Sequence, residues 1–262
     1  KGKEYDIIEH KNFLIEIGYI VPEGSDFKLT TSKIDPEISS IPGPQLVVPI
    51  TNARYALNAV NARWGSLYDA LYGTDIIDGE RQSEGYSEER GAKVVTWSKE
   101  FLDEFFPLKE VSWKDLNKIE LVESLLINPN QYIGKLKKGI LLKNNNLHVK
   151  IIVDRNNVIG ANDLAGIANI LVESAISVIM DCEDSVATVD VEDKIVAYRN
   201  WLGLMKGTLT ELVVKDGKEF VRSMNGDEIY KTASGLTGKI KGRSLMLVRN
   251  VGHLMTTNAI LD

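Results

Sequence analysis

The chain has 262 residues, of which 44% are hydrophobic and 26% charged, values typical of a globular protein. Its 31 Lys and Arg residues against 37 Asp and Glu residues give a net charge of −6, so we expect no nucleic-acid partner, because phosphates are bound by clustered positive charge. No apolar run reaches the roughly 20 residues of a membrane span, so no membrane partner is expected. The single cysteine, Cys182, and three scattered histidines exclude a disulfide framework, a Cys-rich zinc site and a histidine metal cluster.

The first 44 residues are expected to form an N-terminal connecting segment. A short helix is predicted to end near Gly18, and four prolines then keep the chain extended. The apolar run Leu46–Ile50 predicts a buried strand. Apolar residues at steps of three and four predict one helix over Asn52–Tyr72 that stops at Gly73. A strand that leads directly into a helix is typical of an α/β unit.

The middle of the chain alternates loops, one helix and hairpins. Residues 74–92 are polar and predict a loop, and residues 93–106 predict a helix that ends before Pro107. Residues 135–160 predict a meander of β-hairpins, with Val158 and Ile159 in its last strand. A second hairpin is predicted around Asp216–Gly217, since this dipeptide favours a type I′ turn.

Two further apolar runs predict buried strands, Ala175–Met180 and Leu245–Val248. The first is followed by a predicted helix that Gly207 stops. Three short strands that each end in polar residues favour a parallel α/β sheet with function at the strand ends, either a TIM barrel or a Rossmann-type sheet. The Gly-x-Gly-x-x-Gly fingerprint of the second alternative follows none of the strands.

Two strand ends carry candidate chemistry. Asp181, Glu183 and Asp184 crowd three carboxylates together, which calls for a cation, arginines, solvent or a helix N-terminus. The plain alternative is that Asp184 or Ser185 caps the next helix. Arg249 leaves a buried strand, where it either binds a substrate carboxylate and stabilises an oxyanion or pairs with a neighbouring acid.

Arg54 and Tyr55 follow the first strand and lie close in sequence to Val47. An arginine beside an aromatic residue at a strand-to-helix turn can hold a nucleotide, with the guanidinium on a phosphate. The plain alternative is that both residues only line the helix. We expect Cys182 to be a small strand-end residue, because a nucleophilic thiol needs a base beside it.

Six segments together resemble malate synthase of the G form, in the right order and over nearly the whole chain. They are Gly43–Pro49, Asn52–Ala59, Arg63–Gly73, Met180–Ala187, Tyr198–Gly207 and Gly242–Met255. The resemblance implies a glyoxylate-cycle acyltransferase that joins acetyl-CoA to glyoxylate and hydrolyses malyl-CoA to malate and CoA, with Mg²⁺ as cofactor. A CoA-dependent β-hydroxyacyl lyase on a similar barrel is a weaker alternative.

The implied fold is α/β, a partial TIM (β/α)8 barrel interrupted by a β-rich α/β insertion. The expected division follows from this fold. It gives a connecting segment (1–44), a first barrel unit (45–63), the first insertion part (64–174), a second barrel unit (175–206), a β-hairpin insertion part (207–243) and a truncated third barrel strand (244–262). Unpaired barrel edges lead us to expect that these strands are disordered, rearranged or covered by a partner, while the insertion keeps its own fold.

The resemblance also implies roles for single residues. Arg249 falls on the catalytic arginine that contacts glyoxylate. Asp181 and Glu183 fall on carboxylates that lie behind the Mg²⁺ ligands and beside that arginine. The positions used for acetyl-CoA correspond to Val47, Arg54, Tyr55, Ser185 and Arg222.

The family's Mg²⁺ ligands and its catalytic aspartate lie on segments without counterparts here, so no metal ligand is expected within this chain. The sequence begins at Lys1 without Met and stops at Asp262 just after an apolar run, so we expect an interior piece of a longer protein. No signal peptide or lipidation motif is present, so we expect it in the cytoplasm. We expect the parent to be monomeric, and the piece to be inactive alone and to associate through its barrel edges.

Overall fold

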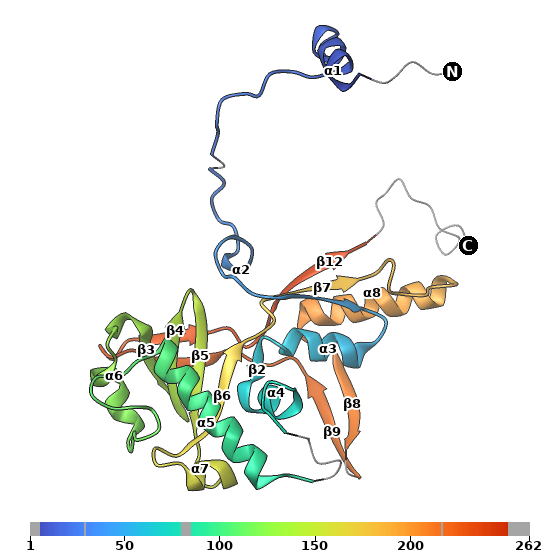
Figure 1. The fold of residues 1–262 in the computed structure, drawn as a ribbon. Coiled ribbons are helices and arrows are strands. Elements are labelled where there is room, and N and C mark those ends of the chain that lie inside the picture. The colour runs from blue at the N-terminus through green and yellow to red at the C-terminus, as the bar shows by residue number, and fades with distance from the viewer. Residues whose placement is uncertain (1–5, 29, 80–84, 216, 251–262) are drawn as a thin grey trace. The chain divides into compact units, whose positions relative to one another are not determined.

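The computed structural model describes residues 6–28, 30–79, 85–215 and 217–250 (Figure 1). The chain divides into two units, Lys1–Ile34 and Asp35–Asp262. In the first unit, Asp6 caps helix α1 (Ile7–Glu16), and Gly18 follows its end with a left-handed φ of 74°. The predicted helix end is therefore confirmed. No described helix is long and apolar enough to cross a bilayer.

The second unit contains the remaining elements. Its helices are α2 (Pro36–Ser39), α3 (Ala53–Asn61), α4 (Leu67–Gly73), α5 (Glu88–Phe105), α6 (Val122–Leu125), α7 (Val158–Asn162) and α8 (Val191–Lys206). Its strands are β1 (Gln45–Pro49), β2 (Trp64–Ser66), β3 (Tyr132–Leu136), β4 (Gly139–Asn144), β5 (Leu147–Val153), β6 (Ile167–Glu173), β7 (Ser177–Asp181), β8 (Thr210–Lys215), β9 (Lys218–Ser223), β10 (Glu228–Lys231), β11 (Thr237–Ile240) and β12 (Leu245–Arg249). The described strands form three sheets.

The three strands expected in the barrel form one parallel sheet in the order β1-β7-β12. Helices α3 and α8 cover one face of it, and their apolar side chains share a core with Val48 and Met180. The first two alternatives expected for these strands, disorder and rearrangement, are wrong for the described residues, which pair in parallel and pack against α3 and α8; the third, cover by a partner chain, stays a prediction. The fold class is mixed α/β, and within the described residues the sheet does not close into a barrel.

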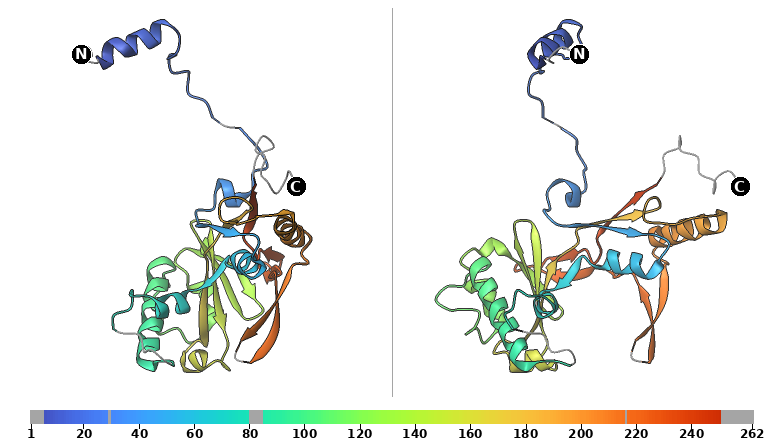
Figure 2. Two further views of the ribbon diagram at one scale, coloured as in Figure 1. Left: turned by 90° about the vertical axis from the view of Figure 1, so that its right-hand side faces the viewer. Right: turned by 45° about the vertical axis from the view of Figure 1, so that its right-hand side comes forward.

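The largest sheet has seven strands in the order β11-β10-β3-β4-β5-β6-β2, and every recorded pairing in it is antiparallel. Helix α5 lies along one face (Figure 2), and its residues Val94 and Leu102 pack against Ile151 and Ile170 in the main core. The helix predicted to end before Pro107 is confirmed, and the predicted meander is confirmed over β4 and β5. The predicted hairpin around Asp216–Gly217 is confirmed as the separate β8–β9 pair.

Three predictions of local structure are wrong. The loop expected over residues 74–92 ends early, because Ser87 caps α5 and the helix begins at Glu88. The helix predicted over Asn52–Tyr72 is interrupted. The chain leaves the helix after α3, and the next residues form β2, which pairs with β6. Val158 and Ile159 begin helix α7 instead of ending the meander, because the side chain of Asn157 accepts a hydrogen bond from the Ile159 amide and caps a helix there.

The chain crosses between the parallel sheet and the seven-stranded sheet at adjacent places. The amides of Ser174 and Ala175 donate to the carbonyls of Arg63 and Ala62 at 2.7 and 3.0 Å. The Ser244 amide donates to the Val60 carbonyl at 3.0 Å. The chain therefore leaves α3, leaves β6 and enters β12 at neighbouring places. Residues 251–262, the end of the expected third barrel unit, lie outside the described residues.

Candidate functional site

The carboxyl ends of the three parallel strands are level. Pro49, Asp181 and Arg249 occupy matching register positions on β1, β7 and β12. One residue earlier, Met180 points into the core beneath α3 and α8. Successive side chains in a strand point to opposite faces, so Asp181 and Arg249 point to the face that the helices do not cover.

Arg249 and Asp181 form a two-pronged ion pair. Nε and Nη2 of Arg249 donate to the two carboxylate oxygens of Asp181, each at 2.9 Å. Nη2 also lies 3.1 Å from a carboxylate oxygen of Asp184. The Asp181 side chain has no exposed surface, whereas that of Arg249 is 44% exposed. Within the described residues these contacts engage Nε and Nη2, and they leave Nη1 for another acceptor.

Asp181 is fixed from its other side by the turn that follows β7. The amides of Glu183 and Ser185 donate to its two carboxylate oxygens, each at 2.9 Å. The hydrogen bonds from Arg249 lead the causes that hold the pKa of Asp181 well below its usual value, and they outweigh the effect of burial. The same pairing raises the pKa of Arg249. Asp181 is therefore an anion at neutral pH and orients the Arg249 cation.

The acidic cluster is linked to arginine, which was one of the alternatives open from sequence. The helix-cap alternative is wrong, because Asp190 caps α8 and its side chain accepts from the Asp193 amide at 2.9 Å. Asp184 instead lies beside Arg249. Cys182 is buried, and burial, the largest cause, raises the pKa of its thiol, so it is a small strand-end residue as expected.

The carboxylates described here do not fit an Mg²⁺ site. No group of three or more His, Cys, Asp or Glu side chains in the described part of the chain is arranged to hold a metal ion. Both oxygens of Asp181 already accept hydrogen bonds from Arg249 and from the backbone. An ion bound there would compete with the guanidinium, so these acids serve the arginine.

The residues expected at acetyl-CoA lie around the same strand ends. Val47 of β1 is 58% exposed and shares a face with Pro49 two residues later. Arg54 and Tyr55 lie exposed in the first turn of α3, which Asn52 caps. Ser185 is exposed in the turn after β7. The residues just before α3 are anchored, because the Asn200 side-chain amide of α8 donates to the Ile50 carbonyl at 2.9 Å.

Arg222 comes to this region from a distant part of the sequence. It lies on β9, and its Nη1 donates to the Asn58 side-chain oxygen of α3, 164 residues away. Arg222 also lines an open pocket of about 330 Å³ together with Asn61, Phe220 and Asn225. The structure thus brings Arg222 to the helix that carries Arg54 and Tyr55.

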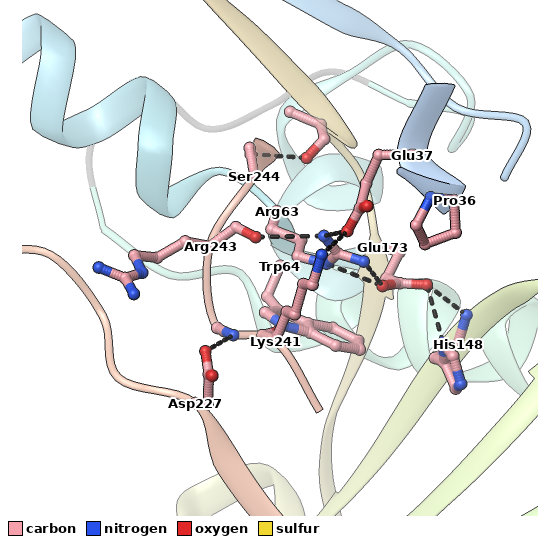
Figure 3. Close-up of polar contacts among 12 residues, drawn as sticks. Pro36, Glu37, Arg63, Trp64, His148, Glu173, Asp227, Lys241, Arg243 and Ser244 are labelled. Carbon is pink, nitrogen blue, oxygen red and sulfur yellow. Dashed lines mark hydrogen bonds and ion pairs between the residues drawn. The ribbon is translucent and has the colours of Figure 1, made fainter. Parts of the chain in front are cut away.

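A buried ionic cluster that was not predicted from sequence surrounds Arg63, near the residues that lead into β7 and β12 (Figure 3). Arg63 contacts carboxylate oxygens of Glu37 at 2.8 Å and of Glu173 at 2.7 Å, and all three side chains are at most 3% exposed. Lys241 adds a second cation to Glu37 at 2.7 Å, and the His148 amide donates to Glu173 at 2.8 Å. The partners are 26 and 110 residues from Arg63, so no local sequence pattern pointed to this cluster.

The cluster keeps its acids charged despite burial. Burial raises the pKa of Glu37, but the hydrogen bonds from Lys241 and Arg63 outweigh it and leave the pKa lowered. Burial also raises the pKa of Glu173, but the hydrogen bonds from His148 and the charge of Arg63 outweigh it and leave the pKa lowered. Arg63 also donates to the carbonyl of Arg243, two residues before β12 begins, at 3.2 Å. The cluster therefore holds the segment that leads to Arg249.

Comparison with known proteins identifies the family. Residues 86–137 match the family model described as the malate synthase G alpha-beta insertion domain. A protein named malate synthase G from Halalkalibacterium halodurans is 46% identical over 97% of this chain and 38% of its own length. Its namesake from Corynebacterium efficiens is 46% identical over 97% of this chain and 36% of its own length. The chain therefore belongs to the malate synthase G family and spans somewhat more than a third of the length of these relatives.

Proposed function

We propose that this chain is the part of a malate synthase that supplies the catalytic arginine and much of the acetyl-CoA site. The complete enzyme would condense acetyl-CoA with glyoxylate and hydrolyse malyl-CoA to malate and CoA, as an acyltransferase of the glyoxylate cycle. The observation that supports this most is the Arg249–Asp181 pair at level strand ends, on the face free of helices.

The reaction needs a proton removed from the acetyl methyl group, a stabilised enolate and an aldehyde held in place. Arg249 would hold glyoxylate and stabilise the developing negative charge through the N–H groups that Asp181 does not use. Asp181 would fix the plane of the guanidinium, with Asp184 and Glu183 adding negative charge beside it. Val47, Arg54, Tyr55, Ser185 and Arg222 would bind acetyl-CoA.

We expect the 262-residue chain to be inactive alone. Mg²⁺ would serve the complete enzyme as a Lewis acid on glyoxylate, but Asp181 and Asp184 already pair with Arg249. The alternative function is a folded module without catalysis. An assay of the isolated chain with acetyl-CoA, glyoxylate and excess Mg²⁺ tests this expectation, and glyoxylate-dependent CoA release would contradict it.

The role of Arg249 is tested by Arg249→Lys in the full-length enzyme that contains this sequence. Lysine keeps the charge but cannot make the two-pronged contact with Asp181, so we expect turnover to fall by about 100-fold or more. The measurement is the rate of CoA release from acetyl-CoA and glyoxylate. Arg199→Lys, on the exposed side of α8, is the matched control and should keep its activity. A near-normal rate for Arg249→Lys would remove this residue from the mechanism.

A further inference from the structure

Helix α3 holds the β8–β9 hairpin through two asparagine side chains. Asn61 donates to the Ser223 carbonyl at 2.9 Å and accepts from the Asn225 amide at 2.8 Å. Asn58, one turn earlier, accepts from Nη1 of Arg222. Arg54, Asn58 and Asn61 are spaced by four and three residues, so they share one face of the helix. The hairpin therefore presents Arg222 along the same helix face as Arg54.

The partner of Arg222 is neutral, which distinguishes this arginine from the two that contact carboxylates. Arg63 and Arg249 each contact two carboxylates, which offset their charge. Arg90 is buried and donates to four backbone carbonyls, so its donors are consumed within a loop. Arg222 is half-buried, lines an open pocket and is oriented by one amide oxygen. Its full positive charge is thus held in a fixed direction and left for an anion.

We propose that Asn58 is a positioning residue that orients Arg222 toward a phosphate group of acetyl-CoA. The inference rests on the proposed function, which assigns Arg222 to acetyl-CoA and gives no role to Asn58. A guanidinium held in one direction loses less side-chain entropy when it binds phosphate, so the orienting amide increases affinity without touching the ligand. The side chain at position 58 must be neutral for this role, because a carboxylate at the same place would bind the guanidinium in competition with phosphate.

Two substitutions of nearly the same size separate positioning from a structural role. Asn58→Leu removes the acceptor, and we expect it to weaken acetyl-CoA binding to the chain about tenfold, a change typical of one charged hydrogen bond. Asn58→Asp keeps the acceptor but neutralises Arg222, so we expect similar weakening although the protein unfolds at an equal or higher temperature. A merely structural asparagine would instead be replaced by aspartate without loss of affinity.

The measurement is calorimetric titration of the 262-residue chain with acetyl-CoA and, separately, with S-acetyl-pantetheine, which lacks the nucleotide phosphates. Asn58→Leu should weaken only acetyl-CoA binding. In an Arg222→Ala background the Leu substitution should have no further effect, since the residue it positions is gone. Asn156→Ala, exposed in the β5–α7 turn, is the matched control and should bind both ligands normally.

The possible failures are distinguishable. If Arg222→Ala weakens acetyl-CoA binding and Asn58→Leu does not, the positioning role is wrong while the proposed function stands. Equal weakening of both ligands by Asn58→Leu would show a general disturbance of the site and would also overturn the inference. If the unsubstituted chain binds no acetyl-CoA at millimolar concentration, the proposed acetyl-CoA site of this chain fails and the inference fails with it.

Discussion

Asp181 and Arg249 are 68 residues apart in the chain and opposite each other in the sheet. A buried carboxylate without a partner is costly, whereas one that receives two backbone amides and a guanidinium fork is stable as an anion. The backbone turn after β7 and the end of β12 are thereby fixed to one another through a single carboxylate. The position of the Arg249 guanidinium in the candidate site therefore depends on the Asp181 side chain.

The pairing predicts how stability depends on pH. The folded-state pKa of Asp181 lies below the value of about 3.9 expected in the unfolded chain, so its contribution is complete above that value and is lost as the pH falls through the folded-state pKa. Asp181→Asn removes this contribution. We expect it to lower the free energy of unfolding at pH 6 by about 2 kcal/mol and to make the loss between pH 6 and pH 3 smaller.

Urea unfolding of the 262-residue chain at several pH values is the measurement. Asp184→Asn is the control, because Asp184 is 76% exposed and its loss should leave the pH dependence nearly unchanged. An Asp181→Asn chain with the same pH dependence as the unsubstituted chain would contradict the assignment.

At the scale of elements, Arg63 explains why the chain leaves helix α3 where it does. The periodic apolar pattern continues through Trp64, but Arg63 is drawn into the contact with Glu37 and Glu173, and the next residues pair with β6. A buried cation between two acids is costly to disturb, because removing it leaves uncompensated charges.

Arg63→Met is therefore expected to lower the free energy of unfolding by about 3–5 kcal/mol, since the apolar stem is kept and only the cation is lost. Lys93→Met is the matched control. It breaks the exposed pair with Glu89 on α5 and should cost less than about 1 kcal/mol. Urea unfolding followed by circular dichroism measures both. Equal effects of the two substitutions would mean that the buried cluster contributes no more than a surface pair.

The sequence predicted the elements whose signals are local. The strands around 46–50, 175–180 and 245–248, the end of α8 at Gly207 and both hairpins follow from apolar runs and turn residues, and all are present. Strand β2 was missed because its three residues continue a helical period and are recruited by β6. Strands β3, β6, β10 and β11 were also not predicted.

The candidate site likewise contains residues that local sequence signals predicted and residues that they did not. Arg249 and the acidic cluster were found because polar residues at the end of an apolar strand are a local signal. The pairing of Arg222 with Asn58 and the ionic cluster around Arg63 join residues more than 100 positions apart, and no local pattern encodes such partners. The roles of Val47, Arg54, Tyr55, Ser185 and Arg222 come from the family resemblance and stay predictions.

At the scale of the molecule, the boundary between the two units falls at Ile34, whereas the connecting segment was expected to extend to residue 44. The intervening residues include Glu37, which is 6% exposed and bound to Arg63 and Lys241. The short helix α2 is thus fixed to the second unit through one charged side chain.

Two truncated chains test this boundary. A chain that starts at Asp35 should unfold at the same temperature as the 262-residue chain, because it keeps Glu37. A chain that starts at Gln45 should unfold about 5–10 °C lower, since Arg63 and Lys241 lose a buried partner. Thermal unfolding followed by circular dichroism is the measurement. Glu37→Gln within the Asp35 chain is the companion variant and should reproduce most of the shift.

The adjacent crossings between the parallel sheet and the seven-stranded sheet have a consequence for how such a chain can change over generations. The chain leaves at Arg63 and returns at Ser174, yet these two residues are joined by a hydrogen bond of 2.7 Å. Everything between them begins and ends at one point in space. Loops inside such a stretch can change in length over generations without moving the strands on either side, provided that Glu173 remains to neutralise Arg63.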